Sequence, residues 1–331
     1  MDPITHGLLG GTICHAAFSR HLGRKALFIG AVSAMAPDVD IFIRSPSDPL
    51  LALEFHRHFT HALAFIPVGA LLVALPWLLR KKNQPILKWI YAASFLGYAT
   101  HGILDLFTSY GINLFLPFSR TRPALDWIAI IDPIFTIALA VSFFLSFRKT
   151  ASRYAANAAL IFCSLYLCLG IVQKNRALEA QQKIALSRKD SIERSRVMPM
   201  PGVNFVWRSI YLSHGRVHAD LIRIPIWNYP AWIGGESADL YQAIPDPEIQ
   251  YDVHRLEYFS DGWLGTPMTD PSLLADLRYS LDSSGFRPLW ALKIENKRMT
   301  LFQDRSGFSG FPVQKLWGEL TGEDVRYKPV P

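Results

Sequence analysis

Hydrophobic residues occur in long runs through the first half of the chain, and short charged loops separate these runs. Beyond about residue 173 polar and charged residues are interspersed, as in an ordinary water-exposed domain. Several runs approach the ~20 residues that a helix needs to cross a bilayer. The apolar runs cover residues 4–18, 27–43, 62–79, 86–107, 128–147 and 154–172. The pattern predicts an α-helical polytopic membrane domain of about five to six apolar helices.

This change of pattern predicts the domain organisation. Residues 1–173 are expected to form a transmembrane helical domain. Residues 174–200 are polar and helix-favouring, which indicates a linker or stalk helix, and residues 201–331 are expected to form a smaller β-rich soluble domain. Within the last of these, the alternation over 205–226 predicts a hairpin. Two further stretches are expected to alternate strand-like segments with turns, namely 246–261 and 290–311.

Composition and charge support a membrane location. Of the 331 residues 50% are hydrophobic, and the mean hydropathy is +0.17, whereas soluble proteins rarely average above zero. The net charge of +7 comes largely from basic clusters at 20–25, 80–88 and 148–153, in alternate loops. Basic loops stay in the cytoplasm, so the opposite loops and the soluble domain are expected on the extracytoplasmic face of a bacterial inner membrane. Without a basic stripe or a DNA-binding motif, no nucleic-acid partner is expected.

Candidate chemistry centres on the stretch Gly-Tyr-Ala-Thr-His-Gly-Ile-Leu-Asp at 97–105. His101 and Asp105 are four residues apart, so on a helix they share one face. Ionisable groups inside apolar runs are costly and usually functional, although a hydrogen-bonded pair that only ties helices together is an equal alternative. The dipeptide Thr-His occurs three times, ending at His6, His61 and His101, each time near aspartates. This repetition favours one site assembled from several helices.

The residue types of this set are those of a metal site. Imidazole and carboxylate ligands without thiolate suit zinc, with manganese or iron as alternatives. The candidates suit a two- or three-metal cluster, or one metal with orienting neighbours. Three arginines, Arg57, Arg120 and Arg122, are candidates for binding an anionic head group, although interfacial snorkelling explains each of them as well. The candidate metal ligands are Asp2, His6, Asp38, Asp40, His56, His61, His101 and Asp105, of which Asp38, Asp40, His101 and Asp105 are also candidate catalytic residues.

Four motifs in order carry a resemblance to a known family. They are Met-Asp-Pro-Ile-Thr-His-Gly at 1–7, Pro-Asp-Val-Asp at 37–40, His-Arg-x-Phe-Thr-His at 56–61 and the stretch at 97–105. This set resembles that of the bacterial inner-membrane YbcI/YdjM-like family, which is labelled as membrane-bound, metal-dependent hydrolases. The resemblance covers about the first 135 residues. It implies that the motif aspartates and histidines are metal ligands, and it implies little about the substrate.

Three functions fit these observations. The first is a metal-dependent hydrolase of a phosphoester or related bond in a membrane lipid or lipid-linked substrate, because a metal activates water and neutralises phosphoryl charge. The second is a metal or proton transport protein with the same ligands along a path, but the helix halves near the basic loops look wholly apolar. The third is a non-enzymatic membrane scaffold with a structural metal.

Overall fold

The computed structural model divides into two compact units. The first comprises Met1–Ile43 and Phe55–Ile171, and the second comprises Arg44–Glu54 and Val172–Pro331. We call them the helical unit and the sheet unit. The structure describes the whole chain except residues 49, 147, 149–151, 203, 243–246, 269, 296–297, 304–317, 320 and 323–326.

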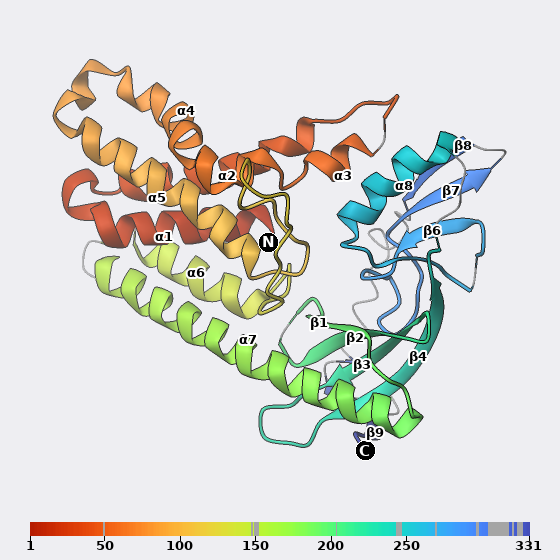
Figure 1. Ribbon diagram of the computed structural model, residues 1–331. Coiled ribbons are helices and arrows are strands. Elements are labelled where there is room, and N and C mark those ends of the chain that lie inside the picture. Colours follow the sequence, from red (N-terminus) through yellow and green to blue (C-terminus); the bar gives the residue numbers. More distant parts are fainter. Residues whose placement is uncertain are drawn as a thin grey trace. The chain divides into compact units, whose positions relative to one another are not determined.

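In the helical unit, α5 runs alongside α1, α2 and α4, and α6 packs on α1 (Figure 1). Asp2 begins α1 as its N-cap, because its side chain accepts from the Thr5 amide at 3.0 Å and Pro3 follows at the first helical position. The helix α2 ends just before Pro37, which lies in the first turn of a 3₁₀ helix. The elements that begin in this unit, together with the short α3, are α1 (Pro3–Leu22), α2 (Lys25–Met35), η1 (Ala36–Phe42), α3 (Leu51–Phe55), η2 (Phe59–His61), η3 (Leu63–Phe65), α4 (Ile66–Leu78), η4 (Lys81–Ile86), α5 (Leu87–Leu106), α6 (Pro133–Leu145) and α7 (Ser152–Arg188).

Three glycines let α1, α2 and α5 approach at backbone distance. A Cβ atom on Gly10 would lie 2.5 Å from the carbonyl oxygen of Gly30, and a Cβ atom on Gly97 would lie 2.7 Å from the same oxygen. Such distances are impossible for real side chains, so these positions require glycine. The close crossing brings the later turns of α5 against the first turns of α1, where His6, His101 and Asp105 lie.

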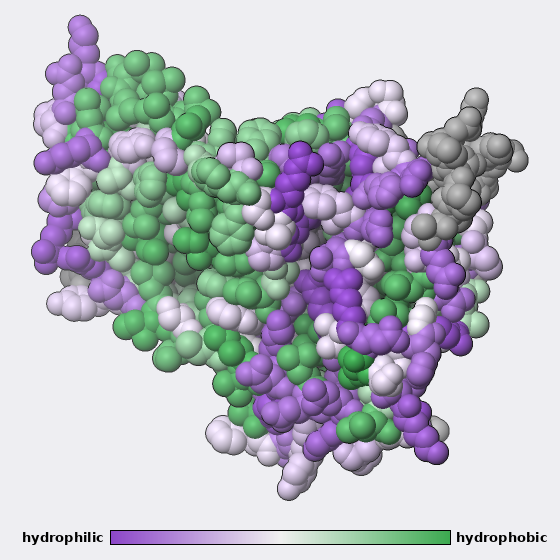
Figure 2. Space-filling view, in the orientation of Figure 1, coloured by the Kyte–Doolittle hydropathy of each residue, from purple (hydrophilic) through white to green (hydrophobic). Residues whose placement is uncertain are grey.

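The prediction of five to six membrane-spanning helices is wrong. Among the described residues α7 alone is long and apolar enough to cross a membrane, and a second span is reached only if the bent pair Leu51–His61 and Leu63–Leu78 counts as one. The helices α2, α4 and α6 have 11, 13 and 13 residues, about 16–20 Å of helix against ~30 Å of hydrocarbon. Hydrophobic residues nevertheless gather on the surface of the helical unit (Figure 2).

The sheet unit is an antiparallel sheet with strand order β1 to β8 and β9 paired with β4. The last turns of α7 pack on it, with Ala177, Ala180 and Ile184 against Trp207 and Ile222. A helical region followed by an antiparallel sheet domain is therefore confirmed. The elements are β1 (Arg194–Pro199), β2 (Val206–Ser213), β3 (Arg216–Arg223), β4 (Ala231–Leu240), α8 (Pro247–Phe259), β5 (Leu264–Thr266), β6 (Leu273–Asp276), β7 (Trp290–Glu295), β8 (Arg298–Gln303) and β9 (Lys328–Pro329).

Two details differ from the sequence-based expectation for this region. The predicted hairpin is confirmed as β2 and β3, and β7 and β8 confirm strands in 290–303, while 304–311 lies outside the described residues. The strand-like prediction for 246–261 is wrong, because α8 occupies it. The expected linker or stalk at 174–200 is occupied by the second part of α7 and by β1.

The segment Arg44–Glu54 is held within the sheet unit by one arginine. Arg255 on α8 makes ion pairs with Asp48 and Glu54, both at 2.9 Å, and its side chain is only 11% exposed. In the chain this segment joins η1 to His56, so both of its ends lead directly to candidate site residues.

Candidate metal centre

Seven of the eight candidate ligands come together in the helical unit, and they arrive from several elements. His6 lies on the second turn of α1, and Asp38 and Asp40 lie on η1. The remaining residues are His56 before η2, His61 at the end of η2, and His101 with Asp105 on one face of α5.

Four side-chain atoms point to a common place. Asp38 Oδ1 lies 3.6 Å from His61 Nε2 and 3.4 Å from His101 Nε2. Asp105 Oδ2 lies 3.5 Å from His61 Nε2 and 3.4 Å from His101 Nε2. The two Nε2 atoms are 2.9 Å apart. Asp38 Oδ1 and Asp105 Oδ2 therefore each lie within 3.6 Å of both imidazole nitrogens.

These five distances are close to those between ligand atoms around a bound metal ion. Ligand atoms about 2.0–2.1 Å from a tetrahedral ion lie about 3.3 Å from one another. The four carboxylate–imidazole distances exceed this value by 0.1–0.3 Å, and the contact between the imidazoles is shorter by about 0.4 Å. Asp105 Oδ2 is buried without a hydrogen-bond partner, as expected of an oxygen reserved for an ion.

Both imidazoles are oriented by hydrogen bonds at their other nitrogen. His61 Nδ1 lies 3.0 Å from the Thr60 hydroxyl and 3.2 Å from Asp40 Oδ2, and His101 Nδ1 lies 2.5 Å from the carbonyl oxygen of Ala34. Each Nδ1 can donate to these oxygens, and Nε2 of a neutral imidazole held in this way is then able to bind an ion. Histidine ligands of metals are usually held in this way by a carboxylate or a carbonyl group.

Asp40 is used differently from Asp38. Its Oδ2 accepts from the Arg57 amide at 2.9 Å and from the Thr60 hydroxyl at 3.0 Å, and its Oδ1 lies 2.9 Å from His56 Nδ1. Asp40 therefore joins η1 to the segment that carries His61. Arg57 has a φ of 62°, a left-handed conformation that this contact holds in place.

The pKa values of both aspartates lie well below the usual range. For Asp38 burial acts to raise the pKa, but the interactions with His101 and His61 outweigh it and lower the pKa. For Asp40 burial likewise raises the pKa, and the contacts with His56 and His61 outweigh it. Both carboxylates are therefore negatively charged at neutral pH.

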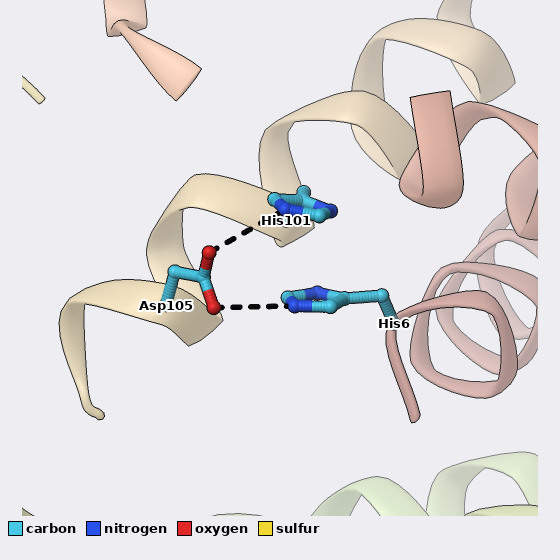
Figure 3. Close-up of side chains that lie close together, drawn as sticks. All are labelled: His6, His101 and Asp105. Atoms are coloured by element: carbon cyan, nitrogen blue, oxygen red, sulfur yellow. Dashed lines mark hydrogen bonds and ion pairs between the residues drawn. The ribbon is translucent and has the colours of Figure 1, made fainter. Parts of the chain in front are cut away.

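The second oxygen of Asp105 lies among groups that can carry positive charge. His6 Nε2 is 3.2 Å and Arg57 Nη2 is 3.1 Å from Asp105 Oδ1, and the amino group of Met1 also donates to this oxygen. The ring of His6 stacks on that of His101, with ring centres 3.7 Å apart. Nε2 of His6 faces Asp105 Oδ1, and Nε2 of His101 faces Asp105 Oδ2 (Figure 3).

Three groups of residues meet the distance requirements of an ion. They share Asp38 or His101, and all of them lie in the same cluster. Two members lie toward the outside of the site, because the side chains of Asp38 and His56 are 15% and 26% exposed while the others are fully buried. The groups are His6 with His101 and Asp105, Asp38 with His61 and His101, and Asp38 with Asp40 and His56.

The other predicted site residues lie in different environments. Asp2 caps α1, with its Oδ2 accepting from the Thr5 hydroxyl at 2.6 Å. Arg122 donates to the carbonyl group of Gly111 at 3.3 Å. Arg120 is exposed in the same loop, between α5 and α6. Of the three arginines, only Arg57 makes a direct contact with a clustered carboxylate among the described interactions.

Sequence analysis missed several groups that support the site. Thr108 accepts from Arg57 Nη1 at 3.0 Å, and the Arg57 guanidinium lies 4.7 Å from the ring centre of Tyr110. The amide of Asn113 donates to the carbonyl group of Arg57 at 3.0 Å. Thr108, Tyr110 and Asn113 all follow Asp105 in the loop between α5 and α6. Polar residues this close to a site motif were the signal that could have identified them.

Comparisons with known proteins found a related sequence and a matching family. The chain is 24% identical over 211 residues to the uncharacterized protein YfhP of Bacillus subtilis (strain 168), an alignment that covers 60% of this chain. It spans 62% of that relative, which is less than two thirds. No solved structure gives a significant match. The profile of the YdjM inner membrane proteins matches residues 1–177 of 331, including every clustered residue, and the chain therefore belongs to the YdjM inner membrane protein family.

Proposed function

We propose that this chain is a metal-dependent hydrolase that cleaves a phosphoester or related bond in a lipid-like substrate at the membrane. The observation that carries the proposal is the meeting of two imidazole nitrogens and two carboxylate oxygens at ligand-like distances, with both imidazoles oriented from behind. The buried Asp105 Oδ2, which has no hydrogen-bond partner, is better explained by a bound ion than by a merely structural network. Membership of an inner membrane family supports a substrate in or on the bilayer.

The residues that would hold the ion are Asp38, His61, His101 and Asp105. Their donor set suits zinc first, with manganese and iron as alternatives. A divalent ion at this position supplies a bound water of lowered pKa and a positive charge opposite a phosphoryl group. We assign Asp40 to orienting His61 rather than to direct ligation, because its two oxygens already accept from protein donors.

Arg57 and His56 take the roles beside the ion. Arg57 binds Asp105 Oδ1, which leaves Oδ2 directed at the ion, and adds a positive charge for an anionic substrate. His56 stands at the more exposed edge with its Nδ1 on Asp40, so its Nε2 can carry a proton to a leaving group. Arg122 lies 5.8 Å from the ring centre of Tyr110, on which Arg57 also stacks, and is the second candidate for holding a head group.

We further propose that the site faces the extracytoplasmic side. The basic loops 20–25, 80–88 and 148–153 support this orientation, because positively charged loops remain in the cytoplasm. A lipid substrate would then be taken from the outer leaflet of the inner membrane.

Metal content and activity test the proposal together. The full-length chain is purified in detergent and supplied with zinc or manganese. Elemental analysis should then find about one ion per chain. His101→Ala should abolish binding, and His254→Ala, which removes an exposed imidazole on α8, should not. The metal-loaded chain should hydrolyse a phospholipid or a generic phosphodiester. Folded wild type without metal, or metal-loaded protein that turns over neither substrate class, would refute the hydrolase.

A further inference from the structure

The connection between β3 and β4 carries two aromatic side chains that nothing in the sheet unit covers. Trp227 is 92% exposed and Tyr229 is 93% exposed. Ile226 beside them is 42% exposed. Large aromatic side chains left fully open cost solvation and mark contact surfaces when they cluster. Trp and Tyr together are the residues that gather at the boundary between membrane and water.

This loop is fixed to α7 just before Trp227 and again between the two aromatic residues. Arg176 Nη1 donates to the carbonyl oxygen of Pro225 at 2.9 Å, and its Nη2 donates to that of Asn228 at 3.2 Å. Gln173 Nε2 donates to the carbonyl oxygen of Ile224 at 2.7 Å. Figure 1 shows the loop, in teal, beside the middle of α7. The position of the loop along α7 is therefore set by the protein.

That position coincides with the end of the apolar stretch of α7. The chain is uncharged and apolar over 154–172, and polar residues begin at Gln173. Arg176 lies four residues beyond Val172, which is about 6 Å along a helix. The polar head-group layer of a bilayer is about 5–8 Å thick on each side. If the apolar stretch spans the hydrocarbon, the loop lies in the head-group layer.

We propose that Trp227 and Tyr229 form an interfacial anchor that inserts into the head-group layer of the phospholipid bilayer crossed by α7. The anchor holds one end of β2 and β3 at the membrane surface. The turn at the other end of the hairpin, His214, lies about 23 Å away along the eight-residue strand β2 and is in water. This anchor depends on α7 crossing the membrane and is independent of the chemistry of the metal centre.

A depth probe tests the anchor in the full-length chain. The background carries Cys168→Ser, because Cys168 is the exposed cysteine while Cys14 and Cys163 are buried. Asn228→Cys receives an environment-sensitive fluorophore between the two intact aromatic residues. The matched control carries the same label at His214→Cys, an exposed turn of the same sheet. Both proteins are placed in nanodiscs of phosphatidylethanolamine and phosphatidylglycerol, with or without lipids that bear a quencher near the head group.

The label at 228 is expected to emit at shorter wavelength and to be quenched by the modified lipid, and the label at 214 is expected to show neither effect. Adding W227S and Y229S should return the 228 label to the behaviour of the 214 label, without loss of fold, because both side chains are almost fully exposed. Equal behaviour of the two labels in the parent protein would overturn the anchor. A wavelength shift without lipid quenching would also overturn it, since it would identify a protein surface as the occupant.

Discussion

Replacing Asp40 by asparagine tests whether Asp40 binds the ion itself or orients the ligand His61. The carboxylate of Asp40 accepts from His61 Nδ1 at 3.2 Å, from the Arg57 amide at 2.9 Å and from the Thr60 hydroxyl at 3.0 Å. Asp40→Asn keeps the size of the side chain and an acceptor oxygen, but it removes the charge that raises the basicity of His61. We expect metal affinity to fall while the number of ions bound stays the same.

The expected loss of metal affinity follows from the role of Asp40 as the residue that orients His61. Loss of a carboxylate behind a histidine ligand typically weakens metal binding about 10–100-fold, or about 1.4–2.7 kcal/mol. Asp38→Asn is the matched control, because it makes the same chemical change two residues away at an atom that faces both Nε2 atoms. Removing this ligand should cost much more, and binding should be close to undetectable.

Competition with a chelator of known affinity measures both variants. Each purified protein is first stripped of metal, and its fold is checked before the titration. If Asp40→Asn loses metal as completely as Asp38→Asn, Asp40 is itself a ligand and the assignment fails. If its affinity equals that of wild type, the contact with His61 has no effect on the ion, and the account of the oriented imidazole is wrong.

Three further outcomes follow from the structure. Gly30→Val should lower the free energy of unfolding in detergent by about 1–3 kcal/mol or more, because the Cβ atom of the valine would overlap the carbonyl group of Gly10. Arg255→Ala should speed protease cleavage in 44–54, whose ion pairs it removes, and unchanged cleavage would show that these pairs do not hold the segment. Metal affinity should fall as pH drops through the neutral range, because ligand imidazoles must lose their protons to bind an ion. Burial acts to lower the pKa of His61, but the contacts with Asp105, Asp38 and Asp40 outweigh it and raise the pKa to about 10. Asp38 adds no pH dependence there, since its pKa lies well below the usual range, and affinity that is flat to pH 5 would refute histidine ligation.

The sequence was informative where local rules decide structure. The four-residue spacing of His101 and Asp105 places them on one face of α5, and the alternation over 205–226 corresponds to the hairpin of β2 and β3. The number of membrane spans was not predictable from apolar runs alone, because breaks such as the one at Pro37 divide a run into elements too short to cross.

The helix α8 shows a signal that was present but misread. Among the side chains of α8 that the structure describes, the buried hydrophobic ones are Val253, Leu256 and Phe259, which recur every three positions. A strand would have buried alternate positions, so this spacing indicates a helix. Pro247 at its first position is a further helix start signal. Hydrophobic content alone suggested a strand here, and periodicity would have corrected it.

The sequence could not distinguish the roles of Asp38 and Asp40, and the reason is physical. Both are in one motif, so the sequence makes them equivalent ligands. In a 3₁₀ helix of about three residues per turn, residues two apart point about 120° apart around the axis, so the two carboxylates meet different partners. Asp38 turns to the imidazole nitrogens, and Asp40 turns to the backbone of the segment that brings His61. The same turn thus offers a candidate ligand on one side and supports the segment of a second candidate ligand on the other.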